Sequence, residues 1–256
     1  MRLATWNVNS LTARLPRVTE WITQQQPDVL CLQETKQADE KFPAAAFADL
    51  GYQSVHHGEG RWNGVALISR VGLTDVTRGF ATPEDEHGAR CVAATCGGVR
   101  VYSVYVPNGR SLDSEFYGYK LAWLARLRAV LDAAHGPGGP VAVCGDFNVA
   151  PDDGDVWDPA AFVGLTHVTE PEREALRHVM AWGLEDVFRR FNPPGVFSWW
   201  DYRGGDFHQG RGVRMDLLLV SGDLAERACG AFVDRDARKG QKPSDHAPVV
   251  ADFGDT

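Results

Sequence analysis

Acids and amides follow apolar stretches repeatedly in this sequence. Residues 141–144 are apolar and lead within two positions to Asp146 and then Asn148. Asn7 follows an apolar stretch near the beginning, and Glu34 ends another. A carboxylate at the end of a buried strand is unfavourable unless it has a partner or a function. These residues are therefore candidates for a functional site.

Further polar residues extend the pattern. Asn9 follows Asn7, Asp216 lies within a late apolar stretch, and Asp245 and His246 precede the last one. Several carboxylates in one site repel each other, and one takes up a proton unless a cation intervenes. Oxygen ligands select hard ions such as Mg²⁺ or Mn²⁺ rather than zinc. The pattern predicts a site for such an ion.

Hydrophobic patterning predicts the elements that position these residues. Strands are expected where β-branched and apolar residues run together, and helices where apolar residues recur at helical spacing. The expected strands are 3–8, 28–34, 64–70, 90–95, 99–106, 196–202, 213–221 and 248–253, with a further strand leading to Asp146, and the expected helices are 16–26, 114–134 and 172–181. Proline is expected in the first turn of the first helix. The pattern predicts an α/β protein with mixed sheets, whose strand ends build the site, and one domain over residues 1–256.

Composition narrows the class of protein. The chain has 256 residues, 44% of them hydrophobic, and a net charge of −8, which argues against nonspecific coating of nucleic acid. An enzyme with a carboxylate-rich site remains compatible with this charge. No stretch approaches the roughly 20 apolar residues of a membrane span, and the first residues lack a signal-peptide pattern. We expect a cytoplasmic protein, with its 5 cysteines reduced and buried.

Seven motifs occur in an order that carries a resemblance: TWNVNS, QETK, WNGVALISR, YVPNG, GDFNVAP, RMDLLLVS and SDHAPV. Together they resemble the exonuclease III family of abasic-site DNA endonucleases, within the endonuclease/exonuclease/phosphatase superfamily. GDFN and SDH mark only the superfamily, whereas QETK, YVPNG and WWDYR with RGVRMD narrow it to DNA repair. The resemblance covers almost the whole chain. It implies a four-layer α/β sandwich, in which two packed mixed β-sheets are flanked by helices.

The resemblance also implies roles around a metal ion. Glu34 would be the principal ligand, with Asn7 adjacent and Asp245 close by. Asp146 would orient and help deprotonate the attacking water, and Asn148 would fix that geometry, with both residues next to the ion.

A second group would face the phosphate. Asp216 would hold His246, which donates to a nonbridging phosphate oxygen, and Tyr105 would contact the same phosphate or its water. Asn9 would be a supporting polar contact. The sequence lacks a GxSxG serine elbow, so a phosphate is the expected partner of His246 rather than a serine nucleophile.

Substrate contacts follow from the same resemblance. Lys36, Asn108 and Arg110 would reach DNA near the site, although solvated surface side chains are the alternative for each. Trp199, Val213 and Met215 would form an apolar pocket for a sugar without its base, or else be ordinary core residues of two strands. Val213 is smaller than the aromatic residue of some relatives, which predicts a looser pocket. The acid-rich segment 152–158 is expected to be a solvated loop.

The expected function is Mg²⁺-dependent hydrolysis of DNA 5′ to abasic sites, with Mn²⁺ as a possible substitute ion. Accompanying 3′→5′ exonuclease and 3′-phosphatase or phosphodiesterase activities are expected. The partner would be double-stranded DNA with abasic sites or 3′ ends, bound by a monomer without a membrane or an obligate protein partner, near the nucleoid. The alternatives are a phosphoester hydrolase for lipid headgroups or RNA, and a silent binding protein on the same fold.

Overall fold

Two six-stranded mixed sheets form the centre of the protein in the computed structural model, which describes residues 1–80, 88–134 and 139–254. The first sheet has the order β11-β12-β1-β2-β4-β3, and the second β5-β6-β7-β8-β10-β9. The strands of the first are β1 (Arg2–Asn7), β2 (Val29–Gln33), β3 (Gln53–His57), β4 (Val65–Ser69), β11 (Ala228–Val233) and β12 (Val249–Phe253). Those of the second are β5 (Thr74–Arg78), β6 (Cys91–Cys96), β7 (Val99–Tyr105), β8 (Val141–Asp146), β9 (Leu184–Asp186) and β10 (Asp216–Ser221). Parallel pairs β1–β2 and β7–β8 lie among antiparallel ones.

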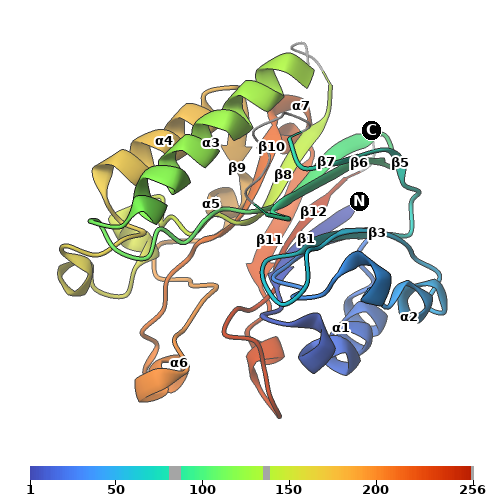
Figure 1. Ribbon diagram of the computed structural model, residues 1–256, viewed down its shortest axis with the longest axis horizontal. Helices are drawn as coiled ribbons and strands as arrows, with labels where there is room; N and C mark the ends of the chain where they lie inside the picture. Colours follow the sequence, from blue (N-terminus) through green and yellow to red (C-terminus); the bar gives the residue numbers. More distant parts are fainter. Residues whose placement is uncertain (81–87, 135–138, 255–256) are drawn as a thin grey trace.

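Helices cover the outer face of each sheet (Figure 1). Helices α1 (Leu11–Gln25) and α2 (Ala44–Ala48) pack on the first sheet, and α3 (Glu115–Ala134) and α4 (Glu170–Met180) on the second. Shorter helices are α5 (Val187–Phe191), α6 (Asp206–Gln209) and α7 (Gly222–Glu226). The 3₁₀ turns are Asp39–Lys41, Asp153–Asp155, Pro159–Phe162, Arg203–Gly205 and Arg235–Arg238. This confirms the predicted four-layer α/β sandwich. Among the described helices, none is both long and apolar enough to cross a bilayer.

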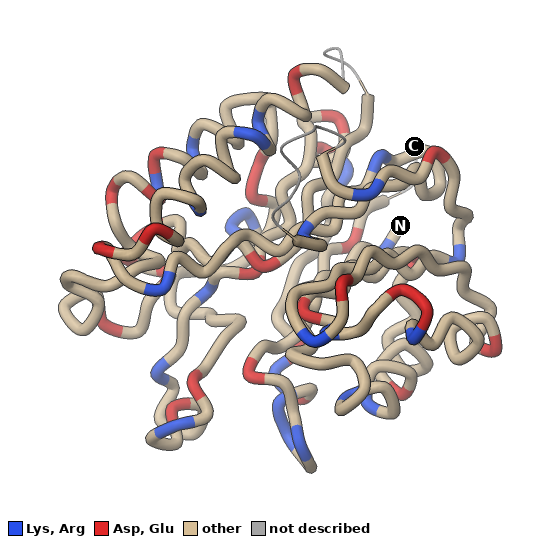
Figure 2. Tube along the Cα trace, viewed as in Figure 1, with Lys and Arg blue, Asp and Glu red and all other residues tan. Residues whose placement is uncertain are grey.

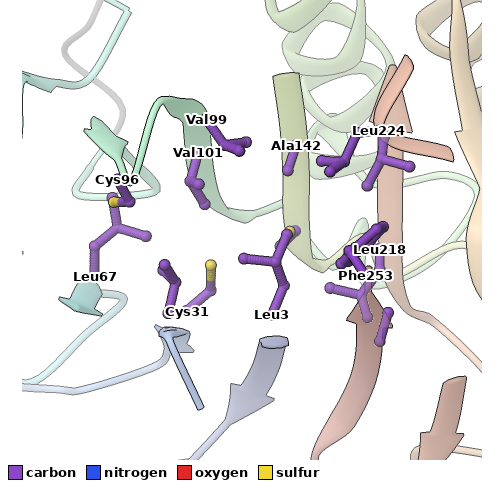
Figure 3. Close-up of a cluster of buried hydrophobic side chains, with 14 of the residues drawn as sticks. Leu3, Cys31, Leu67, Cys96, Val99, Val101, Ala142, Leu218, Leu224 and Phe253 are labelled. Carbon is purple, nitrogen blue, oxygen red and sulfur yellow. The ribbon is translucent and has the colours of Figure 1, made fainter. Parts of the chain in front are cut away.

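The main core lies between the two sheets (Figure 3). Leu3, Cys31 and Leu67 of the first sheet face Val101 and Ala142 of the second, and all are at most 1% exposed. Inner strands are apolar on both faces because helices cover the other side. This packing gives the strand ends a rigid base.

Strand register brings the candidate residues to one end of the sandwich. Asp146, at the end of β8, pairs with Tyr105 of β7 and with Asp216 of β10. In the other sheet, Asn7 at the end of β1 pairs with Gln33 of β2, and Glu34 comes next. Because β10 runs antiparallel to β8, its first residue meets the last residue of β8.

Several elements differ from expectation. The first helix begins at Leu11, so Pro16 lies inside it rather than in its first turn. Proline removes only one backbone donor there, and the buried face of the helix compensates. Residues 196–202 form no strand; Trp199 makes only isolated bridges, to Val213 and His246. Strands β3, β5, β9 and β11 were not expected, since they lie at or near sheet edges and carry weak apolar patterns.

Two local expectations about burial are also wrong. Asp155 is fully buried in the segment 152–158, where it pairs with Arg214 at 2.6 Å and also with Arg189. Asp152, Asp153 and Trp157 of that segment are exposed, but the ion pairs of Asp155 anchor it to the core. Cys229 is exposed, whereas the other four cysteines are buried.

Candidate active site

Asp146 and Asn148 form one side of the site at the end of β8. The Asn148 backbone N–H donates to Asp146 Oδ1 at 2.9 Å, and its side-chain Nδ2 donates to Val106 O at 3.0 Å. Asn148 Oδ1 accepts from Asn108 Nδ2 at 3.1 Å. Asn148 has a φ of +51°, a left-handed value that is uncommon for residues other than glycine. Such conformations cluster at functional sites, where the surrounding structure holds them in place.

Asn7 joins the two sheets at the centre of the site. Its Nδ2 donates to Glu34 Oε1 at 2.8 Å and to Asp146 Oδ2 at 2.9 Å. Its Oδ1 accepts from the backbone N–H of Asn9 at 3.0 Å. In this arrangement Asn7 presents donors, not its oxygen, to the two carboxylates; a role as a ligand stays a prediction.

Lys36 and Asn9 lie beside Glu34. Lys36 Nζ is 2.9 Å from Glu34 Oε2 and donates to Asn9 Oδ1, while Asn9 Nδ2 donates to Asp245 Oδ1 at 3.1 Å. Glu34 and Lys36 have φ values of +50° and +52°, so the turn after β2 aims both side chains at the site. Asp245 also accepts from Trp199 Nε1 at 3.2 Å.

Asp216 and His246 form a buried pair. His246 Nδ1 lies 2.9 Å from Asp216 Oδ2, and its Nε2 lies 3.8 Å from Asp146 Oδ2. Ser198 Oγ donates to the same Asp216 oxygen at 2.5 Å. The imidazole is therefore oriented by one carboxylate and turned toward another.

The combined effects of burial and neighbouring charges raise the pKa values of both Asp146 and His246. Burial, with a contribution from Asp216, raises the pKa of Asp146 to about 7, although His246 and Asn7 act against it. Burial alone would lower the pKa of His246, but Asp216, Asp146 and Asp245 raise it to about 10. Near neutral pH the site therefore holds a protonated imidazole beside a carboxyl that can take up or release a proton.

Tyr105 completes the anionic side of the site. Burial, and then the Glu34 and Asp146 carboxylates, raise the pKa of its phenol well above the ordinary value. The guanidinium of Arg90 lies 4.7 Å from the centre of its ring. Tyr105 is therefore a neutral hydrogen-bond donor at any physiological pH.

Two of the three residues predicted to form the sugar pocket are buried. Val213 is 0% exposed and Met215 3%, and both pack with Ala150 and Val156 in a small core cluster. Phe162, Val168 and Trp199 close over this cluster. That the smaller Val213 loosens the pocket stays a prediction. Only Trp199, of the three predicted pocket residues, is partly exposed.

The backbone N–H of Arg110 donates to Asn108 Oδ1 at 3.1 Å, while its side chain stacks on an aromatic ring. Its guanidinium lies 3.5 Å from the centre of the Phe116 ring, at the start of α3, and the residue is exposed. Asn108, in contrast, touches Asn148 directly. The other predicted polar residues meet within one cluster: Asn7, Asn9, Glu34, Lys36, Tyr105, Asp146, Asn148, Asp216, Asp245 and His246.

Sequence reasoning missed two serines that orient this cluster. Ser198 Oγ accepts from the backbone N–H groups of Met215 and Asp216, each at 3.2 Å, besides donating to the Asp216 carboxylate. Ser244 Oγ donates to Asn7 O at 2.7 Å and accepts from His246 N at 3.2 Å. Buried serines give no sequence signal, although the position of Ser244 within SDHAP was a hint.

Comparisons with known proteins agree with this geometry. Residues 4–246 match the Endonuclease/Exonuclease/phosphatase family. Exodeoxyribonuclease III of Haemophilus influenzae is 36% identical, over 99% of this chain and 100% of the relative. An AP endonuclease from Archaeoglobus fulgidus superposes with a TM-score of 0.96 at 38% identity, covering 100% of both chains. The 3′-5′ exonuclease NExo from Neisseria meningitidis also gives 0.96, at 40% identity and 99% coverage of both.

Proposed function

Because the chain belongs to the endonuclease/exonuclease/phosphatase family, and within it to the exonuclease III family of DNA-repair nucleases, we propose that it hydrolyses DNA phosphoesters 5′ to abasic sites and at 3′ ends. The observation that carries this proposal is the convergence of an amide and an imidazole on one carboxylate, Asp146, while the same amide also binds a second carboxylate, Glu34. Asn7 bridges Glu34 and Asp146, and His246 faces Asp146 from the other side.

The donors fit a hard divalent cation. Glu34 and Asp146 lie close enough to share one amide group, and burial holds the pKa of Asp146 near 7. Such crowded negative charge is what a divalent ion neutralises, and oxygen donors suit Mg²⁺ or Mn²⁺. Asp146, Asp216 and His246 also offer ligand atoms within 4.8 Å of one another. Since Asp216 and His246 are already bonded to each other, we assign the ion to Glu34 with Asp146 and Asp245 nearby.

The residues divide the hydrolysis among them. Asp146 orients a water and takes its proton, while Asn148 and Asn7 hold the carboxylate. His246 and Tyr105 donate to nonbridging phosphate oxygens, where negative charge develops in the transition state. A bound Mg²⁺ supplies Lewis-acid neutralisation of the phosphate and the leaving oxygen. Cleavage 5′ to an abasic site leaves a 3′-hydroxyl and a 5′ deoxyribose phosphate.

A basic rim supports DNA as the substrate despite the net charge of −8. Figure 2 shows Lys and Arg on two loops that project from the site end of the sheets, around α6 and after β11. The residues are Arg203, Arg211, Arg235, Lys239 and Lys242, of which Arg203, Arg211 and Lys239 pair with acids of the same loops. Lys36 adds a cation beside Glu34. We propose a monomer that acts on double-stranded DNA in the cytoplasm, at the nucleoid.

The burial of Val213 and Met215 favours 3′-end processing as the stronger of the two activities. An extrahelical abasic sugar needs a cavity, but Val213 and Met215 are covered by Phe162, Val168 and Trp199. A phosphate or nucleotide at a 3′ end can reach Asp146 without entering such a pocket. We therefore expect faster removal of a 3′ group than incision at an abasic site.

Three labelled duplexes test this function: one with an abasic-site analogue, one with a recessed 3′ end and one with a 3′-phosphate at a nick. Each is incubated with Mg²⁺, with EDTA, and with the Asp146→Asn variant in Mg²⁺. We expect Mg²⁺-dependent cleavage that falls at least about 10²-fold in Asp146→Asn. Asp132→Asn, an exposed carboxylate on α3, is the matched control. If the folded protein cleaves none of the three duplexes, its substrate is another phosphoester.

Metal binding has a readout besides activity. Mg²⁺ that binds only the folded state raises the Tm, and tenfold more ion above Kd adds about 1.4 kcal/mol. We expect this rise in the wild-type protein and in Asp132→Asn, and its loss in Glu34→Gln. An unchanged Mg²⁺ response in Glu34→Gln would remove Glu34 from the ion site.

A further inference from the structure

Lys120 is a fully buried cation that the proposed mechanism does not use. It lies on α3 with a side chain 0% exposed, and its Nζ is 2.5 Å from Glu172 Oε1 on α4, whose side chain is equally buried. An ion pair removed from water in this way is seldom worth more to stability than apolar residues of the same size. Its position suggests another role.

The remaining protons of Lys120 go to the two loops that carry the site amides. Nζ donates to Asn148 O at 2.5 Å and to Asn108 O at 3.4 Å. An ammonium group has three protons, so one nitrogen joins α4, the loop after β8 and the loop after β7. The side chains of Asn148 and Asn108 then meet each other at 3.1 Å.

Glu172 fixes the ammonium from the opposite side. It caps the start of α4 with Thr169, and its Oε1 also accepts from the backbone N–H of His167 at 2.9 Å. His167 Nδ1 in turn lies 2.6 Å from the same Asn148 carbonyl oxygen. The left-handed backbone of Asn148 is thus held by two side chains, both tied to Glu172.

We propose that the Lys120–Glu172 pair is a positioning unit, which sets the placement of Asn108 and Asn148 relative to each other and to Asp146. This inference rests on the proposed function of Asn148. Lys120 acts through backbone carbonyls, so it touches neither substrate nor the reacting atoms. Positioning of this kind affects kcat more than KM, because the alignment matters in the transition state.

The test replaces both charges together, with Lys120→Met and Glu172→Gln in one protein, so that no unpaired buried charge remains. We expect kcat on the recessed 3′ end to fall about 10- to 100-fold, with KM changed less than about threefold. In an Asn148→Ala background the same pair of substitutions should lower kcat less than about threefold, because the positioned side chain is gone. If the pair of substitutions lowers kcat in the Asn148→Ala background by the same factor as in the wild-type protein, the proposal is wrong.

The control removes another ion pair, Arg2–Asp252, which joins the chain ends of β1 and β12 at 2.7 Å. Arg2→Met with Asp252→Asn should lower the Tm and leave kcat unchanged. If the Lys120/Glu172 variant likewise changes only the Tm, the pair is merely structural and the proposal is wrong.

Two further measurements keep the test decisive. Lys120→Arg retains the charge for folding, but its larger planar guanidinium points its donors differently from the compact ammonium, so we expect kcat still to fall at least about tenfold. Wild-type kcat in a folded Lys120→Arg protein would overturn the proposal. The side-chain amide NMR signals of Asn108 and Asn148 should shift in both Lys120 variants and not in the control. This readout is independent of nuclease activity, whose absence in the wild-type protein would count against the proposed function instead.

Discussion

At the scale of single residues, the site depends on opposite protonation of Asp146 and His246. The Asp146 carboxyl has a pKa of about 7 and the His246 imidazole has a pKa of about 10. His246 Nε2 lies 3.8 Å from Asp146 Oδ2. A base must be deprotonated and a phosphate donor protonated. Between these values both requirements are met, which makes the pair suited to phosphoester hydrolysis.

This arrangement predicts a bell-shaped pH profile. Activity should rise as Asp146 loses its proton near pH 7 and fall as His246 loses its proton near pH 10. Mg²⁺ favours the carboxylate and should move the acidic limb to lower pH. Asp216→Asn removes a charge that raises the pKa of His246, so the basic limb should also move to lower pH. Rates of 3′-end removal from pH 5 to 11 check both limbs, which belong to a coupled site. If the basic limb does not move in folded Asp216→Asn, that limb does not report the titration of His246.

At the scale of elements, β8 is the rigid base of the site, and Gly145 allows its close approach to β7. A Cβ at Gly145 would lie 1.9 Å from Val104 O, which is backbone and cannot move aside. The residue before Asp146 must therefore be glycine for the strands to pair at this distance. Close strand pairing therefore explains the glycine of GDFN, which the motif alone did not.

Gly145→Ala should consequently destabilise the protein by at least about 2 kcal/mol and lower nuclease activity by displacing Asp146. Gly118→Ala on α3 is the control, because a Cβ there meets nothing within 4 Å. That substitution should stabilise the protein by about 0.5–1 kcal/mol. Urea unfolding of both variants measures the two changes. Equal stability of Gly145→Ala and wild type would show that β7 and β8 can separate without loss.

At the scale of the whole molecule, two sheets face each other across a core that encloses three of the cysteines. Cys31, Cys96 and Cys144 lie between the sheets, and Cys91 lies under α3. Burial raises the pKa of Cys96 to about 11. Cys229 on β11 is exposed. That one domain spans residues 1–256 stays a prediction.

Thiol labelling should reflect this division. Thiolates are the reactive form, and buried thiols with raised pKa values are inert. A native protein treated with an aromatic disulfide reagent should release about one equivalent rapidly, and Cys229→Ser about none. All five thiols should react after unfolding in guanidinium. Rapid reaction of two or more in the native state would mean that the sheets open readily.

The sequence by itself determined the chemistry of the site and the class of the fold. Acids and amides at strand ends, together with apolar runs of strand length, predicted a site for a hard ion on an α/β protein with mixed sheets, whereas the two packed sheets and the hydrolase activity were implied by the resemblance of the motifs. Residue types and local spacing carry that information directly. The same reasoning failed at weak edge strands such as β5 and at residues 196–202, where tertiary contacts decide the conformation rather than local pattern.

Only the tertiary structure decided how the groups meet. Asn7 and Asp146 are 139 positions apart in the chain, yet one amide joins them across two sheets. The support from Ser198 and Lys120, and the burial of Val213, also depend on packing between distant segments. Local periodicity does not determine such distances, because they depend on how the layers pack against one another.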